Sequence, residues 1–158
     1  MVFLKINEIE QAQRNWAGML TAIGYAYITN DDFRSLARHF IAEMYGYLEG
    51  VVLFKPTKAS DKPFRLTAES ALSYFIGGDP EYPEDTGFAL HPWRNVRFEN
   101  AGFIPEKHHV LTMGHYYFTG LKGDELKVEF TMGWFKTRDG RLKINLHHSS
   151  LPFCRKRE

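Results

Sequence analysis

The sequence predicts an α+β fold in which N-terminal helices pack on one face of a curved antiparallel sheet. Two changes of pattern carry this prediction. Apolar residues repeat at helical spacing through the first third of the chain, and from Phe88 onward they alternate with a period of two. The length of 158 residues fits one domain. We expect a single domain over 1–158, with a helical part at about 7–50, a mixed part at 51–87 and an antiparallel meander at 88–153.

Two helices are expected in the first part. The first is predicted by apolar residues that share one helical face: Ile9, Ala12, Trp16, Met19, Leu20 and Ile23. The polar segment 29–32 then offers N-cap residues for a second helix, which Gly50 would end. Its apolar stripe is formed by Phe33, Leu36, Ala37, Phe40, Ile41, Met44 and Leu48.

The mixed part begins with a short strand at 51–54, which Pro56 stops from pairing further. Thr67 then caps a short helix at 68–76, and a loop rich in proline and acidic residues follows at 79–85. Strand-like segments lie near 93–103, 108–119, 125–137 and 141–150. A sheet of this kind curves around its helices like a cone and leaves a pocket at the wide end.

The last strand turns from apolar to polar residues that can carry chemistry. Its core face is marked by Leu142, Ile144 and Leu146. Strict alternation then places His148 and Ser150 inward, and His147 and Ser149 on the other face. A bulge near Pro152 would exchange the two faces. The alternative is that both histidines are edge groups bonded to backbone.

Composition excludes several classes of partner. The formal charge of +1 lacks the basic excess that nucleic-acid binding needs. No apolar run reaches the length of about 18 residues that a membrane span requires, and we see no signal peptide. We expect a soluble protein, cytoplasmic by default, or periplasmic or plastidic if a precursor segment was removed. Aromatic residues make up 15% of the chain, which is equally typical of a pocket wall and of a packed core.

The metal-ligating residues do not form a site by spacing. Cys154 is the single cysteine, so an intramolecular disulfide and a zinc site with several thiolates are both excluded. Among the seven histidines, His109 and His115 share a strand face but would lie about 20 Å apart. The sequence has no HExxH motif, and no Gly-x-Ser-x-Gly elbow of a serine hydrolase. We therefore expect no metal and no other cofactor.

Several strings along the chain resemble one enzyme family, the iota-class carbonic anhydrases. They are VLFKPTKA at 52–59, ALSYFIGG at 71–78, EDTGFA at 84–89, VRFENAG at 96–102, YYFT at 116–119 and HHSSLP at 147–152. The last string is also similar to the association domains of calcium/calmodulin-dependent kinases. The resemblance runs from about residue 50 to 153. It implies a cone-shaped nuclear-transport-factor-2-like fold and a homodimer through the sheet, with Phe135 at the interface.

The resemblance also implies a reaction and a set of residues. The reaction is the reversible hydration of carbon dioxide to bicarbonate. Some members of the family use manganese or zinc, others no metal, and many carry a third histidine where this chain has Leu146. The metal-free members use a threonine, a tyrosine, a histidine and a serine. Carried over, these are Thr57, Tyr74, His148 and Ser150, with His147 and Ser149 in second rank.

Each of these side chains has a chemical reason to be there. His148 is expected to accept the proton, because an unperturbed imidazole titrates near neutral pH. Tyr74 would hold or relay the attacking water, and the hydroxyls of Thr57 and Ser150 can donate to bicarbonate and accept from water. Two other readings stay open. One is an assembly module of the same fold, and the other is a ligand-binding or isomerase member, which would need an acidic pair inside the cone.

Overall fold

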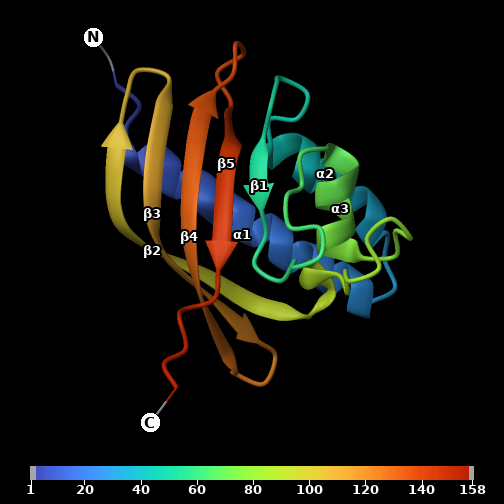
Figure 1. Cartoon of the computed structure of the whole chain (residues 1–158). Helices are drawn as coiled ribbons and strands as arrows, with labels where there is room; N and C mark the ends of the chain where they lie inside the picture. Colours follow the sequence, from blue (N-terminus) through green and yellow to red (C-terminus); the bar gives the residue numbers. More distant parts are fainter. Residues whose placement is uncertain (1–2, 157–158) are drawn as a thin grey trace.

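The computed structural model describes residues 3–156 and confirms the predicted α+β architecture. Its elements, in chain order, are α1 (Ile6–Ile28), α2 (Phe33–Met44), β1 (Leu53–Lys55), α3 (Ala68–Ile76), the 3-10 turn η1 (Phe88–Leu90), β2 (Trp93–Pro105), β3 (His109–Gly120), β4 (Glu125–Lys136) and β5 (Leu142–Ser150). Figure 1 shows the strands curving in front of α1, with α2 and α3 beside the β1 edge. One layer of helices therefore covers one face of the sheet.

The sheet has the strand order β1-β5-β4-β3-β2. The four long strands form the predicted antiparallel meander, and the short β1 joins β5 in parallel. This pairing places Lys55 beside His148. The segment that follows β1 is thus brought to the end of β5, where the polar residues 147–150 lie.

The helices form where the apolar pattern and the caps place them. In α1 the predicted face is buried, with Trp16 at its centre. The side chain of Asp32 accepts a hydrogen bond from the Ser35 amide, 3.1 Å, and so caps the start of α2. The expected end of this helix at Gly50 is wrong. At Tyr45 the chain becomes extended and forms a bridge to Ile144, because this segment runs beside β5.

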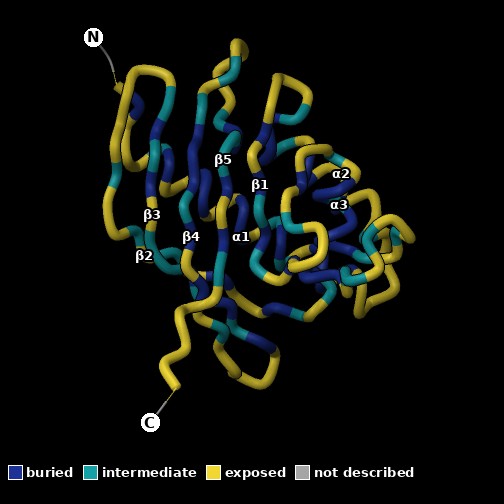
Figure 2. The backbone as a smooth tube through the Cα atoms, in the orientation of Figure 1, coloured by how far each residue is buried: buried dark blue, intermediate teal, exposed yellow. Residues whose placement is uncertain are grey.

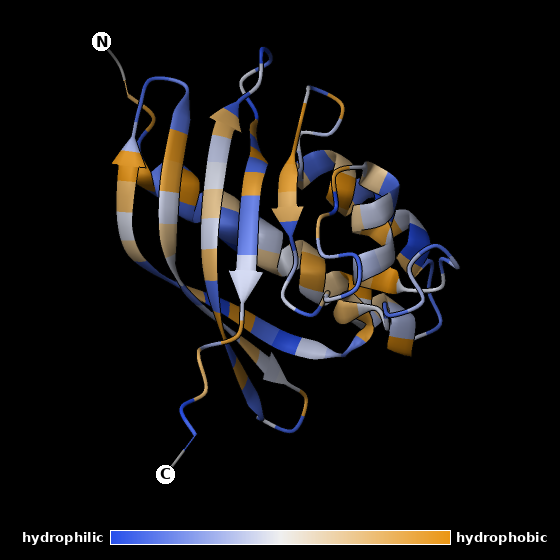
Figure 3. Cartoon of the chain, viewed as in Figure 1, coloured by the Kyte–Doolittle hydropathy of each residue, from blue (hydrophilic) through white to orange (hydrophobic). Residues whose placement is uncertain are grey.

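Aromatic side chains fill the space between the sheet and the helices. Trp16 lies at the centre of this core. Its ring contacts Phe40, Phe75, Phe98, Tyr116, Phe118 and His147, with ring centroids 5.7–6.5 Å apart. Figure 2 shows buried residues interspersed with more exposed ones along the strands, and Figure 3 shows apolar and polar residues alternating along them. Within the described residues no helix is long and apolar enough to cross a membrane.

A bulge in β5 changes the direction of its side chains. Trp134 of β4 pairs with Ile144, and the preceding Gly133 pairs with Leu146, so Asn145 is an extra residue in β5. A side chain at Gly133 would press on Asn145, because its Cβ would lie 2.9 Å from the Asn145 Oδ1 atom. The glycine therefore leaves room for the extra residue. Every β5 side chain after the bulge points to the face opposite to the one that strict alternation predicts.

Candidate active site

The inward-facing polar residues of β5 are His147 and Ser149. Their exposed fractions are 2% and 1%. His148 is exposed and Ser150 is half-buried, both on the outer face of the sheet. The predicted register, which placed His148 and Ser150 inward, is therefore wrong. The cause of the error is the extra residue Asn145, which precedes the His-His-Ser-Ser motif in β5 and reverses the direction of the side chains that follow it.

One signal in the sequence could have located this bulge. Gly133 interrupts a run of large apolar residues in the interior of a predicted strand, and glycine at such a position often marks a bulge in the pair. The bulge that the sequence suggested near Pro152 was at the wrong end of the motif. A bulge upstream of it, at Asn145, exchanges the same two faces.

A small cavity lies where these residues meet the middle of α1 and the segment after β1. Its volume is about 10 Å³, which is room for about one water molecule. The lining residues are Trp16, Phe54, Pro56, Thr57, Tyr74, Phe75, Phe88, Tyr116, His147 and Ser149. Thr57 and Tyr74, which the resemblance singled out, both line it. No aspartate or glutamate does among the described residues, so the acidic pair of the isomerase reading is not found here.

A chain of hydrogen bonds joins the polar groups of the cavity. His147 bonds to two tyrosines: its Nδ1 atom lies 2.9 Å from the Tyr45 hydroxyl, and its Nε2 atom lies 3.1 Å from the Tyr116 hydroxyl. The Tyr116 hydroxyl also bonds to the Ser149 Oγ atom. Thr57 donates to the same Ser149 oxygen at 3.0 Å. Five residues from four segments therefore share one continuous network around Ser149.

The network contains residues that sequence reasoning missed. Tyr45 and Tyr116 are both fully buried. Tyr116 could have been found, because it begins the YYFT string and shares the core face of its strand with Phe118. Tyr45 gave no such signal, since the pattern placed it inside a helix. It reaches His147 only because the chain leaves α2 at this residue.

Burial sets the protonation states in the cavity. It lowers the pKa of His147 to about 3, and the neighbouring His148 contributes in the same direction. Burial also raises the pKa of Tyr116, although hydrogen bonds from Ser149 and Thr57 oppose this, and it raises the pKa of Tyr74. At neutral pH the cavity therefore contains a neutral imidazole and protonated phenols between apolar walls. Such a site suits a small uncharged molecule.

A buried ion pair fixes the loop that carries Thr57. The two terminal nitrogens of the Arg65 guanidinium group donate to the carboxylate of Asp85, at 2.6 and 2.7 Å. Ser73 of α3 donates to the same carboxylate at 2.7 Å. The side chains of both ions are fully buried. The neighbouring Glu84 accepts hydrogen bonds from three successive backbone amides at residues 60–62. The loop after Thr57 is thus tied to α3, which presents Tyr74.

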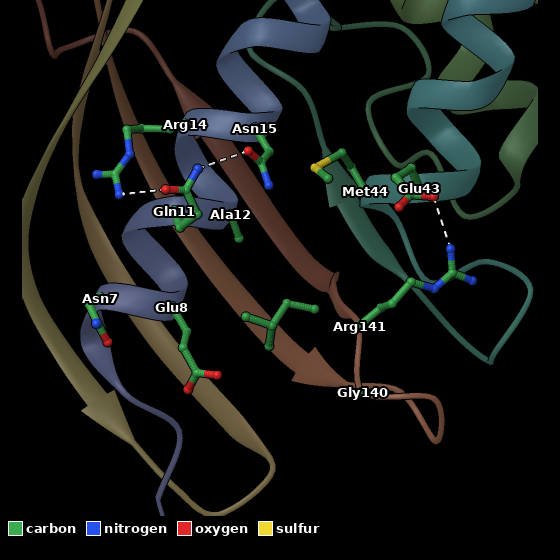
Figure 4. Close-up of a pocket in the computed structure, with 11 residues that line it drawn as sticks. Asn7, Glu8, Gln11, Ala12, Arg14, Asn15, Glu43, Met44, Gly140 and Arg141 are labelled. Carbon is green, nitrogen blue, oxygen red and sulfur yellow. Dashed lines mark hydrogen bonds and ion pairs between the residues drawn. The ribbon is translucent and has the colours of Figure 1, made fainter.

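A larger hollow lies elsewhere and lacks these features. It measures about 560 Å³, and α1, the end of α2 and the turn before β5 surround it. Figure 4 shows that most of its polar side chains pair with one another. Gln11 bonds to both Arg14 and Asn15, and Arg141 forms an ion pair with Glu43 at 3.0 Å. No buried polar group is aimed into this hollow, so it is not the candidate site.

Within residues 3–156 no three histidine, cysteine, aspartate or glutamate side chains lie close enough to hold a metal ion. The cavity itself offers one imidazole and four hydroxyl groups. A catalytic zinc normally takes three protein ligands of the nitrogen, sulfur or carboxylate type. The chemistry of this donor set therefore favours catalysis by side chains.

Comparison with known proteins agrees with this geometry. The family model of the metal-independent carbonic anhydrases matches residues 7–151. A metal-independent carbonic anhydrase from Nostoc sp. strain PCC 7120 is 41% identical over 150 residues, which are 93% of this chain and 73% of that protein. The crystal structure of a cyanobacterial iota-carbonic anhydrase complexed with bicarbonate superimposes with a TM-score of 0.94 at 38% identity, over 98% of both chains.

A more distant structure shows how widely the fold is used. A putative calcium/calmodulin-dependent protein kinase II association domain from Xanthomonas campestris gives a TM-score of 0.58 at 21% identity, over 96% of this chain and 91% of that chain. This likeness shows a shared fold alone. The family model and the Nostoc relative decide between the enzyme and the assembly module. The chain belongs to the metal-independent carbonic anhydrase family.

Proposed function

We propose that this carbonic anhydrase carries out the reversible hydration of carbon dioxide to bicarbonate in the cavity around Ser149. The observation that carries the proposal is the buried hydroxyl network, in which Thr57 and Tyr116 both bond to Ser149 inside aromatic walls. The structurally similar cyanobacterial enzyme was solved with bicarbonate bound. A network of hydroxyl groups fits that ligand, because each group can donate to a carbonate oxygen or accept from water.

Burial supports a different pair for the roles of histidine and serine than alternation did. His147 and Ser149 lie in the cavity, whereas His148 and Ser150 lie on the outer face of the sheet. We therefore assign the functional positions to His147 and Ser149, together with Thr57. These residues come together only because β1 and β5 run side by side.

The reaction needs two kinds of help from these groups. Water attacks the carbon atom of carbon dioxide, and negative charge develops on the carbon dioxide oxygens. The attacking water passes one proton to a second water molecule, which yields bicarbonate and a hydronium ion that leaves to solvent. Preorganised donors stabilise the developing charge. The Ser149 hydroxyl is placed to do so, because it accepts a hydrogen bond from Thr57 and keeps its own proton for the substrate. Tyr74 accepts a hydrogen bond from the Lys58 amide at 3.3 Å, which leaves its own proton free to orient water.

The walls favour the neutral substrate. Trp16, Phe54, Phe75 and Phe88 present apolar rings to the cavity. Carbon dioxide has no net charge and loses little by leaving water, whereas bicarbonate must give up its hydration shell. The walls therefore promote entry of the substrate and release of the product.

The experiment that tests this proposal compares two adjacent serines. Ser149→Ala removes the hydroxyl at the centre of the network and is expected to lower the rate of carbon dioxide hydration by roughly a hundredfold, measured by stopped flow with a pH indicator. Ser150→Ala is the matched control on the outer face, and its rate should stay within about twofold of the wild type. Equal losses in the two variants, or none in either, would refute the assignment of the cavity.

We also propose that two copies of the chain pair through the outer face of the sheet. An apolar row crosses this face in register through all five strands: Leu53, Leu146, Gly133, Leu111 and Ile104. The exposed fractions of Leu53 and Ile104 at its two ends are 53% and 61%. The row is exposed at both ends and half-buried at Leu111 and Leu146 between them. Exposed apolar area of this kind is typical of an interaction surface, and a twofold dimer is the commonest closed arrangement. Phe135 lies against Gly46 at one side of this face, where it stays a predicted interface residue.

A further inference from the structure

Two residues behind the cavity determine what His147 can do. We propose that Trp16 and Tyr45 hold His147 in the tautomer that carries its proton on Nε2, so that His147 donates to Tyr116 and is a positioning residue, not the proton acceptor of the reaction. The assignment of the tautomer is independent of the reaction. Its consequence for catalysis rests on the proposed function.

The direction of the hydrogen bonds is set at the indole. A tryptophan N–H group can only donate, so the Tyr45 oxygen accepts from the Trp16 Nε1 atom at 3.2 Å. Among the described residues, the other polar partner of the Tyr45 hydroxyl is the His147 Nδ1 atom at 2.9 Å. The single proton of Tyr45 therefore points at Nδ1, and Nδ1 must be the unprotonated, accepting nitrogen.

The opposite tautomer would leave a buried donor without an acceptor. With a proton on Nδ1, the Tyr45 oxygen would accept from both Trp16 and His147, and its own proton would have no partner. Tyr45 is completely buried, so water cannot satisfy that proton. The ring of Phe54 also stacks on the imidazole, with centroids 4.9 Å apart and an angle of 15° between the planes, and so holds the ring in place. Burial lowers the pKa of His147, which keeps the ring neutral and gives it a single proton.

The hydrogen bonds that lead from His147 to the cavity are donated in the same direction. A proton on Nε2 donates to the Tyr116 oxygen at 3.1 Å, so the Tyr116 proton is left for Ser149. A hydroxyl that accepts a hydrogen bond becomes a better donor, so the chain strengthens from one group to the next. The Ser149 oxygen lies 3.4 Å from the Glu129 carbonyl, which is a long bond. The Ser149 proton is therefore available to an oxygen of bicarbonate, and the chain acts as a polarised donor to the substrate.

The tautomer can be read directly by NMR. In protein labelled with ¹⁵N-histidine, long-range proton–nitrogen spectra distinguish a protonated ring nitrogen from an accepting one. Seven histidines contribute signals, and the set missing in His147→Gln belongs to His147. The wild-type enzyme is expected to show an accepting Nδ1 and a protonated Nε2. A protonated Nδ1 would overturn the proposal. If the variant does not fold, through-space contacts between the His147 ring protons and the stacked Phe54 ring identify the His147 signals in the wild type.

A pair of tyrosine variants tests the cause. Tyr45→Phe removes the donor to Nδ1, so the His147 signals should shift toward a mixture of the two tautomers, and kcat should fall about tenfold with little change in KM. Tyr47→Phe is the matched control, because its ring stacks on Tyr45 and its hydroxyl bonds to the Arg65 carbonyl instead. It should leave both the spectrum and kcat as in the wild type.

The outcomes separate the two proposals. A wild-type spectrum in Tyr45→Phe would refute the role of Tyr45. A wild-type enzyme with the predicted tautomer but no hydration activity would refute the proposed function and leave this inference standing. An active enzyme with a protonated Nδ1 would refute this inference and leave the proposed function standing.

Discussion

The hydroxyl of Thr57 donates to the Oγ atom of Ser149 at 3.0 Å, although the two residues are 92 positions apart in the chain. This bond closes the cavity between the segment after β1 and the end of β5. It forms because β1 pairs with β5 in parallel, which places Lys55 beside His148. The Lys55 ammonium group then bonds to the Ser149 carbonyl at 2.8 Å and fixes the same junction a second time.

This bond gives a first prediction. Thr57→Val keeps the shape of the side chain and removes its hydroxyl, so Ser149 loses a hydrogen-bond donor that fixes it and becomes a weaker donor to the substrate. We expect the rate of carbon dioxide hydration to fall at least tenfold. Thr57→Ser restores the hydroxyl and should recover most of the rate. A Thr57→Val enzyme with wild-type activity would show that this hydroxyl takes no part in the reaction.

The buried ion pair behind the cavity gives a second prediction, on stability. Asp85→Asn removes the charge that pairs with Arg65, and the guanidinium group is then left buried without its partner. Loss of one member of such a pair costs about 3–5 kcal/mol of unfolding free energy. The measurement is urea denaturation followed by circular dichroism.

A neighbouring acid supplies the control for that measurement. Glu84→Gln changes an exposed carboxylate that accepts backbone hydrogen bonds from the same loop. It should cost only about 1 kcal/mol, because the amide oxygen still accepts the bonds of one carboxylate oxygen and water at the surface can replace those of the other. Equal losses for the two substitutions would contradict a special role of the buried pair.

The neutral state of His147 gives a third prediction, on pH. Its pKa is lowered to about 3 in the folded protein, while an unfolded histidine titrates near 6.5. Between these values the unfolded chain binds the proton and the folded protein does not, so the stability falls as the pH falls. The slope from this one group is at most about 1.4 kcal/mol per pH unit.

The comparison that isolates this group uses one variant. His147→Gln cannot take up a proton, so its unfolding free energy should depend less steeply on pH than that of the wild type between pH 6.5 and 5. Both proteins share the remaining titratable groups, which cancel in the difference. Parallel curves for the two proteins would show that His147 titrates normally in the folded state.

Part of the fold and part of the cavity could be predicted from the sequence, and the rest could not, for physical reasons. Helical spacing located the buried face of α1, since that face depends only on local periodicity. The strings around Thr57 and Tyr74 led directly to two residues of the cavity. The inward pair on β5 was wrong because alternation holds only while the strands pair one to one, and Asn145 breaks that register. Tyr45 could not be found at all, because its contact with His147 spans 102 positions and depends on where α2 ends.

A fourth prediction concerns assembly. If the apolar row on the outer face of the sheet joins two copies, light scattering at micromolar concentration should give twice the chain mass of 18.4 kDa. Ile104→Asp places a charge at one end of the row and should shift the protein toward the monomer. Leu36→Asp is the control, because Leu36 is an exposed apolar residue on α2, on the other side of the sheet. A monomer mass for the wild type would refute the dimer.

The central claim is that the side chains of the cavity catalyse the reaction without a metal ion. The most direct measurement is the stopped-flow rate of carbon dioxide hydration by wild-type enzyme before and after exhaustive chelation, with elemental analysis of the same samples. The cavity offers one neutral imidazole among hydroxyl groups, which is too few ligands for a catalytic zinc. The rate should therefore be unchanged after chelation, with metal well below one equivalent per chain. Complete loss of activity on chelation, restored by adding zinc or manganese, would contradict the claim.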